Sequence, residues 1–146
     1  MYVSQVLMSQ LPNIEIVTLL IVLTTKKFGY KALISVYVFV GLEILTYGIS
    51  DWVIKYLYVW AVLCFIICMS RKIEGALFYT LISSVFGLLF GILCSPVDFF
   101  IGGFAYGITS IVKGIPFDLL HGFGNFLTVI LLYRPLKKAL DKAIKY

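Results

Sequence analysis

The polar side chains of this 146-residue chain are few, and one group of them has the spacing of a chemical site. Asp118, His121 and Asn125 follow one another at intervals of three and four residues, which places them on one face of a helix. Asp118 and His121 could supply two ligands to a metal ion, and Glu15 or Glu43 would have to complete the set. The chain has a single histidine and contains neither an HExxH nor a GxSxG motif. The sequence therefore predicts a protein that is not an enzyme, with no catalytic residue, bound metal or cofactor.

A wider group of residues is suited to binding a small molecule. Charged side chains are costly within apolar segments and usually serve a function there, and aromatic rings offer faces for stacking. The predicted substrate-binding residues are Asn13, Glu15, Glu43, Tyr47, Trp52, Tyr56, Trp60, Asp118, His121 and Asn125. The aromatic members could instead form an ordinary belt at a membrane interface. Asp118 could simply pair with His121, and Asp51 with Lys55 four residues later.

The elements that would position these residues are apolar segments of membrane-spanning length. Hydrophobic residues make up 62% of the chain and charged residues only 13%, whereas soluble domains are nearer one half and one quarter. A bilayer core of ~30 Å requires a helix of about 20 residues. The apolar segments cover 12–28, 32–48, 52–69, 75–95 and 115–133. We therefore expect an all-α integral membrane protein, a single domain over 1–146 built as a compact bundle of five to six transmembrane helices.

Proline and glycine residues mark the expected ends of these helices. Pro12 and Pro116 stand where helices are predicted to begin. Gly48, the pair Ser95-Pro96 and Pro135 stand where helices are predicted to end.

The distribution of basic residues predicts which segments share a side of the membrane. The stretch 97–113 is apolar but contains three glycines, so it could cross the membrane or stay on one side. If this stretch stays on one side of the membrane, ten of the twelve Lys and Arg residues fall together on the opposite side. Only Lys55 and Lys113 then lie on the same side as 97–113. The positive-inside rule favours that case. We therefore expect 97–113 to be an external interfacial or re-entrant segment and 134–146 a basic cytoplasmic tail in a multi-pass plasma-membrane protein. The net charge of +5 is thereby explained by topology and lipid, and no nucleic-acid partner is expected.

This topology places the polar residues at one level of the bilayer. Nearly all of them fall in the outer half of the spans, and the inner half is apolar. A channel would need polar residues through the full depth. The pattern predicts an outward-facing binding site for a small, ring-containing, neutral or cationic molecule, with 97–113 closing over it as a lid.

Small residues recur every four positions in the fourth apolar segment. Ser83, Gly87, Gly91 and Ser95 form a stripe along which another helix can approach closely. Packing inside the bundle and contact with a partner subunit both fit this pattern.

Several stretches of the chain resemble one family of transport proteins. Residues 11–20 (LPNIEIVTLL), 28–33 (FGYKAL) and 115–126 (IPFDLLHGFGNF) are similar to the substrate-binding (S) components of energy-coupling factor (ECF) transporters. The resemblance implies a six-helix subunit that captures a vitamin or related micronutrient outside the cell. It further implies a transmembrane coupling subunit and two cytoplasmic ATPase subunits as partners for ATP-driven uptake. Residues 12–28 resemble the second helix of that family, so we expect a first helix to be missing or truncated.

Two other functions remain open at the level of the sequence. One is a membrane assembly or structural protein without transport activity. The other is a small membrane enzyme that uses Asp118 and His121.

Overall fold

The computed structural model describes residues 1–8 and 15–144, and all regular structure within them is helical. The elements are α1 (Tyr2–Leu7), α2 (Val17–Phe28), the short 3-10 helix η1 (Gly29–Lys31), α3 (Ala32–Tyr47), α4 (Asp51–Met69), α5 (Ala76–Leu88) and α6 (Phe90–Ala143). The all-α class predicted from the sequence is confirmed. Pro12 and Asn13 lie outside the described residues.

Within residues 1–8 and 15–144, three helical stretches are long and apolar enough to cross a membrane. They are Val17–Tyr47, Asp51–Met69 and Ala76–Ala143. Large apolar side chains remain exposed along them, such as Ile34, Phe65 and Leu131. Soluble monomers rarely expose continuous apolar surface of this kind, so the structure is compatible with an integral membrane protein.

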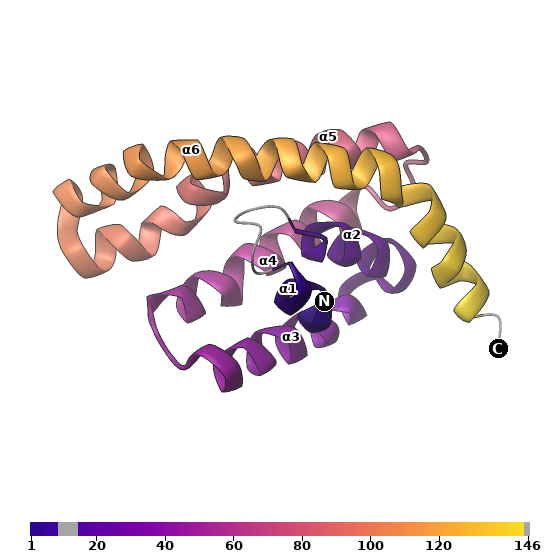
Figure 1. Ribbon diagram of the computed structural model, residues 1–146, viewed down its shortest axis with the longest axis horizontal. Helices are drawn as coiled ribbons and strands as arrows, with labels where there is room; N and C mark the ends of the chain where they lie inside the picture. Colours follow the sequence, from indigo (N-terminus) through magenta and orange to yellow (C-terminus); the bar gives the residue numbers. More distant parts are fainter. Residues whose placement is uncertain (9–14, 145–146) are drawn as a thin grey trace.

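The first and the last of these stretches each turn back on themselves at a glycine. Gly29 has a φ of 64° and Gly103 a φ of 75°. Residues that carry a Cβ rarely adopt such positive values. At Gly103 the long helix α6 reverses, which divides it into an outgoing arm (90–102) and a return arm (104–143). Figure 1 shows these arms as a hairpin that extends beyond the ends of α3 and α4.

The return arm of α6 packs along α5 and its own outgoing arm. The contacts pair Asp98 with Ser110 and Gly91 with Asp118, and they are all centred on the turn at Gly103. Closer to the other end, a Cβ added at Gly87 would lie 2.8 Å from the Gly122 backbone nitrogen. The stripe of small residues therefore packs inside the molecule at Gly87 and Gly91, as one of the two interpretations of the sequence expected.

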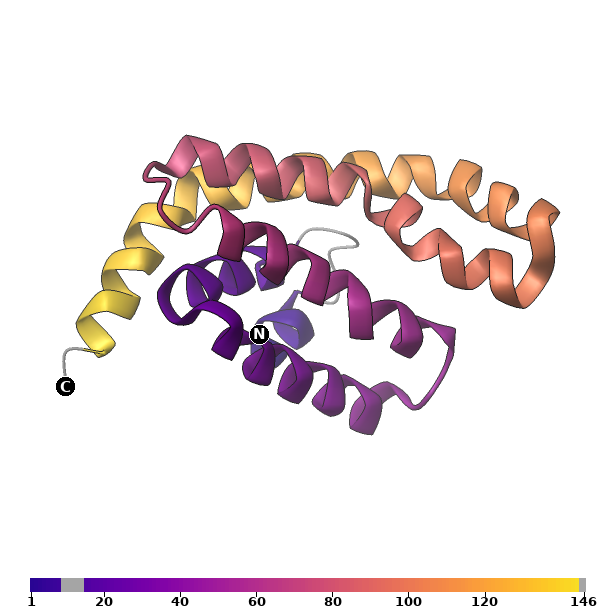
Figure 2. The same ribbon diagram turned by 180° about the vertical axis from the view of Figure 1, so that it is seen from behind.

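Helices α2, α3 and α4 form a second layer against this hairpin. Both views show α3 and α4 running side by side, with α2 between them and α6 (Figures 1 and 2). Fully buried apolar side chains fill the interior of this layer and its contact with α6, including Leu19, Ile21, Val36, Leu63 and Val129. Near Pro135 the end of α6 bends toward the turn at η1 (Figure 1).

The predicted helix ends at proline are wrong, whereas the end at Gly48 is confirmed. Pro96, Pro116 and Pro135 all lie inside α6, and α3 ends at Gly48 with a φ of 78°. Apolar helices tolerate proline where other groups satisfy the carbonyl that the proline cannot reach. At Pro96 that carbonyl belongs to Ile92, and the Ser95 hydroxyl donates a hydrogen bond to it at 2.8 Å. The membrane boundaries of the predicted spans stay a prediction.

Candidate functional site

The polar residues nearest the centre of the molecule begin with Glu15, at the start of α2. Its carboxylate accepts hydrogen bonds from the Thr18 backbone N–H, at 2.8 Å, and from the Thr18 hydroxyl. A carboxylate that caps the first helical turn in this way satisfies donors that have no partner within the helix. On its other side, Glu15 Oε1 lies 3.3 Å from His121 Nε2 on α6. Glu15 and His121 are both buried, and the contact brings together two of the predicted binding residues that are 106 residues apart.

Asn125 extends this contact by one helical turn and connects three helices. Its side-chain NH₂ donates to the Ser83 carbonyl on α5 at 3.1 Å and approaches the Thr18 hydroxyl at 3.4 Å. Asn125 is fully buried. Its Oδ1 and the Ser83 Oγ have no hydrogen-bond partner within the described part of the chain. The network of Glu15, Thr18, Ser83, His121 and Asn125, which we call the polar network, therefore ends in unsatisfied atoms.

A ladder of aromatic rings leads from α4 to this network. Trp52, Tyr56 and Trp60 are spaced by four residues, and their successive ring centroids are 5.3 and 5.4 Å apart. The Trp60 ring lies 5.6 Å from Phe90 on α6, and Phe90 lies 4.9 Å from the His121 ring. These separations are typical of aromatic contacts. The ladder thus joins three of the predicted binding residues to His121 through a ring that was not predicted.

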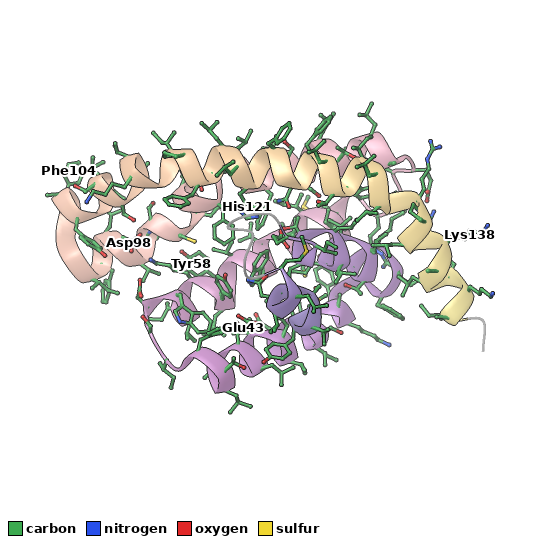
Figure 3. All side chains as sticks on the ribbon, in the orientation of Figure 1. Glu43, Tyr58, Asp98, Phe104, His121 and Lys138 are labelled. Atoms are coloured by element: carbon green, nitrogen blue, oxygen red, sulfur yellow. The ribbon has the colours of Figure 1, made fainter. Side chains whose placement is uncertain are left out.

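Glu43 approaches the same region from α3. Phe39, one turn earlier on α3, packs 6.4 Å from the Trp60 ring. Figure 3 shows Glu43 on α3 and His121 on α6, each on the side of its helix that faces the other layer. Glu43 is buried, and among the described residues neither its Oε1 nor the Trp60 indole nitrogen has a hydrogen-bond partner.

A separate charged cluster ties the hairpin to α4. Lys55 Nζ lies 2.8 Å from Asp51 and 2.7 Å from Asp98, and the Ser110 hydroxyl donates to the second Asp98 oxygen at 2.8 Å. The ion pair expected between Asp51 and Lys55 is confirmed. Lys55 has a second partner in Asp98, whose side chain is only 3% exposed. The cluster of Asp51, Lys55, Asp98 and Ser110, called the latch below, connects α4 with both arms of α6.

Other predicted site residues lie apart from the polar network. Asp118 accepts the Gly91 backbone N–H at 3.0 Å, while His121 contacts Glu15. In place of the proposed Asp118–His121 pair, Asp118 contacts the outgoing arm of α6 and His121 contacts the residue that precedes α2 by two positions. Tyr47 is 55% exposed at the end of α3.

Three contributors were missed by the sequence analysis. Thr18 follows Glu15 by three residues, but this order is the reverse of the Ser/Thr-x-x-Glu capping box, so the spacing gave no signal for it. Ser83 was assigned to the packing stripe, and its carbonyl, not its side chain, receives Asn125. Phe90 stands in a run of apolar residues, and no signal in the sequence distinguishes it from its neighbours.

Nothing in the described ranges 1–8 and 15–144 groups three or more His, Cys, Asp or Glu side chains as metal ligands would be grouped. Comparisons with protein-family models, with curated proteins and with solved structures find no match. The function is therefore argued from the geometry of the polar network and the aromatic ladder.

Proposed function

We propose that this protein is the membrane-embedded substrate-binding subunit of an ECF-type transporter, which captures a small vitamin-like micronutrient from outside for ATP-driven uptake. The sequence resemblance supports the family, and the buried groups around the aromatic ladder support a binding role. A transmembrane coupling subunit and two cytoplasmic ATPase subunits would be its partners.

The observation that carries the proposal is the set of buried polar atoms without partners in the described chain. These include Glu43 Oε1, Trp60 Nε1 and Asn125 Oδ1. Each such atom costs about 1–3 kcal/mol when it is left unsatisfied in an apolar interior. A ligand that forms hydrogen bonds with these atoms removes that cost. Binding of a polar molecule is therefore favoured over leaving the site empty.

The same atoms define the chemistry of the ligand. The Trp60 indole needs an acceptor, and the Asn125 amide oxygen needs a donor. Rings of Trp52, Tyr56 and Trp60 offer stacking or cation–π contact, the latter worth about 0.5–2 kcal/mol. Glu15 and Glu43 are acidic, and an anion beside them would lose hydration without a compensating charge. The ligand is therefore a small, ring-containing, neutral or cationic molecule.

The proposed arrangement in the membrane has five crossing segments of an S-component-like bundle. Val17–Tyr47 turns back at Gly29 and Ala76–Ala143 turns back at Gly103, so each would cross twice. The Gly103 hairpin would lie outside and the C-terminal tail in the cytoplasm. A cysteine introduced at Lys137, after replacement of Cys64, Cys68 and Cys94, should resist an impermeant reagent in intact cells. Labelling of Lys137→Cys would overturn the orientation.

Native mass spectrometry of the purified protein tests the binding role directly. We expect a retained small molecule, and copurification with a coupling subunit and ATPases when these are coexpressed. Uptake should depend on ATP hydrolysis. Turnover of a substrate by the chain alone would instead identify a membrane enzyme, and absence of both ligand and transport partners would identify an assembly protein.

Two substitutions with a matched control test the site. Glu43→Gln and Asn125→Ala should each weaken binding of the retained molecule by up to about ten-fold, because the first replaces a carboxylate acceptor with a neutral amide and the second removes a buried hydrogen-bonding group worth about 0.5–1.5 kcal/mol. Tyr47→Phe, a change at an exposed residue, should leave affinity unchanged. If all three variants bound the molecule as tightly as the wild type does, the site assignment would be refuted. A tightly bound dianion would also refute it.

A further inference from the structure

A pocket of about 280 Å³ lies at the end of the molecule opposite the Gly103 hairpin. The end of α2, the loop before α5 and the last turns of α6 form its walls (Figure 2). The lining residues are Leu23, Lys26, Lys27, Arg71, Glu74, Lys137, Leu140 and Asp141. Four of them are cationic and two are anionic, so the pocket carries a surplus of positive charge. We call it the basic pocket.

The wall of the basic pocket is held by hydrogen bonds that leave its charges in place. Arg71 donates to the Lys26 and Lys27 carbonyls at 3.1 Å each, and so satisfies acceptors at the C-terminal end of α2. Lys26 Nζ donates to the Ile73 and Arg71 carbonyls at 2.7 and 3.1 Å. Because neutral carbonyls accept its bonds, Arg71 is fixed without being neutralised, while Lys26 also pairs with Glu74.

Glu74 shows how an anion sits in this pocket. Its carboxylate lies 3.1 Å from Lys26 Nζ and 3.4 Å from Lys137 Nζ, so it bridges the two walls. The hydrogen bond from Lys26, with the nearby charge of Lys137, lowers the pKa of Glu74 below its ordinary value. The side chain is nevertheless 70% exposed. An external anion can therefore reach Lys137, which is 41% exposed, and compete there with Glu74, whereas Lys26 is only 9% exposed.

We propose that the basic pocket binds the phosphodiester headgroup of an anionic phospholipid, with Lys27 and Lys137 as its charged contacts, where it displaces the internal anions Asp141 and Glu74. The two lysine side chains are 37% and 41% exposed, which keeps them accessible from the surface. A phosphodiester is a strong acceptor for several N–H donors at once. This inference concerns a site remote from the polar network and does not depend on the transport function.

Membrane-facing surroundings favour a lipid over free phosphate as the source of the headgroup. Leu23 and Leu140 line the pocket beside the charges, and α2 belongs to a stretch apolar enough to cross a membrane. Basic clusters at the ends of such helices attract anionic headgroups, at about five-fold in affinity per Lys or Arg.

Native mass spectrometry of the full chain in detergent tests the proposal, with phosphatidylglycerol and phosphatidylcholine added in equal amounts. We expect preferential retention of phosphatidylglycerol. The double variant Lys27→Gln/Lys137→Gln should weaken its binding by at least about ten-fold, at about five-fold for each lysine. Glu74→Gln should strengthen it by a few-fold, because the competing carboxylate is gone. Lys113→Gln, in the hairpin, serves as the matched charge control and should have no effect.

The direction of the Glu74→Gln effect separates binding from loss of structure, since a damaged pocket would bind less and not more. Equal retention of the two lipids would overturn the proposal, and so would a Lys113→Gln effect as large as that of the double variant. Displacement of phosphatidylglycerol by millimolar inorganic phosphate, without preference for the lipid, would identify a soluble phosphate as the ligand and would overturn the lipid assignment.

Discussion

The two ends of the long hairpin hold charged groups in opposite ways. At the Gly103 end, the latch contains three charged residues, and the side chains of Lys55 and Asp98 are only 16% and 3% exposed. At the other end, the basic pocket contains six charged residues, and the side chains of its Lys27–Asp141 pair are 37% and 41% exposed. The comparison teaches that the number of charges and their contribution to stability need not rise together.

The physical reason is the surrounding medium. An exposed ion pair contributes about 0–1 kcal/mol because water solvates both partners nearly as well apart as together. Removal of one partner from a buried pair leaves a charge without hydration or counter-charge. We therefore expect the latch to stabilise the fold and the basic pocket to be adaptable, as a surface that exchanges ligands should be.

The largest effect is expected from breaking the latch. Asp98→Ala should lower the free energy of unfolding in detergent by about 3 kcal/mol, because Lys55 loses its buried partner. Asp51→Ala removes the other carboxylate on the same lysine but at an exposed position, and should cost less than about 1 kcal/mol. Denaturant unfolding followed by tryptophan fluorescence measures both. Equal losses would contradict the distinction between buried and exposed charge.

A smaller effect is expected at the turn that brings the latch together. Gly103 has a φ of 75° and a ψ of −175°, a region that is essentially restricted to glycine. Gly103→Ala should therefore cost about 2 kcal/mol. Gly114→Ala is the control, because Gly114 is helical and, like Gly103, has no atom within 4 Å of an added Cβ. It should stabilise by up to about 1 kcal/mol. If both substitutions changed the free energy of unfolding in the same direction, the backbone conformation of Gly103 would be excluded as the cause of its effect.

At the opposite end, removal of a charge should have little effect on stability. Lys27→Gln breaks the pair with Asp141 and should cost about 0.5 kcal/mol at low ionic strength. The loss should shrink in 1 M salt, where charges are screened beyond about 3 Å. The loss in Asp98→Ala, measured in the same series, should persist because the buried latch is little screened. A salt-independent loss in Lys27→Gln would show that the pair acts as a buried one.

The smallest effect is expected from the titration of Glu74. Lys26 and Lys137 lower its pKa from the ordinary 4.5, so its ion pairs stabilise the folded protein fully above that value. The contribution is lost as the pH falls through the lowered folded pKa. The difference in melting temperature between the wild type and Glu74→Gln should be present at pH 6 and disappear toward pH 3. A difference that grows with acidity would have the wrong sign for this contact.

Local signals in the sequence were sufficient for α3 and α4. The predicted segments 32–48 and 52–69 differ from Ala32–Tyr47 and Asp51–Met69 by one residue at an end. Gly48 stops the first of these helices through its own backbone conformation. Such boundaries depend on neighbouring residues alone and can be predicted without a partner helix.

The reversal of α6 could not be placed in the same way. The sequence offers Gly102, Gly103 and Gly107 within six positions, and only Gly103 leaves the helical conformation. Aromatic rings pack against the other two glycines. A Cβ at Gly102 would meet Tyr106, and one at Gly107 would meet Phe99. The choice depends on packing between the arms, which is not encoded in the spacing of the glycines.

The types of residue in the candidate site could be predicted from the sequence, but their hydrogen-bond partners could not. Costly polar groups in apolar segments correctly indicated Glu15, His121 and Asn125, which the fold brings together. The same rule also selected Asp118, which instead accepts a hydrogen bond from the Gly91 backbone. Asp118 meets a backbone N–H because Gly91 has no side chain: a Cβ added there would lie 2.6 Å from Asp118 Oδ2, so this partner is set by the close approach of the two arms of α6.

The contacts of the return arm of α6 with α5 and with the outgoing arm are centred on Gly103, which has a consequence for the order in which the chain folds. Asp98 and Ser110 are 12 residues apart, Gly91 and Asp118 are 27 apart, and Ser83 and Asn125 are 42 apart. The entropy lost on closing a loop rises with its length, and each contact shortens the loop that the next one must close. We expect the hairpin to close from its turn outward, so that the Ser83–Asn125 contact of the binding region forms only after the Asp98–Ser110 and Gly91–Asp118 contacts.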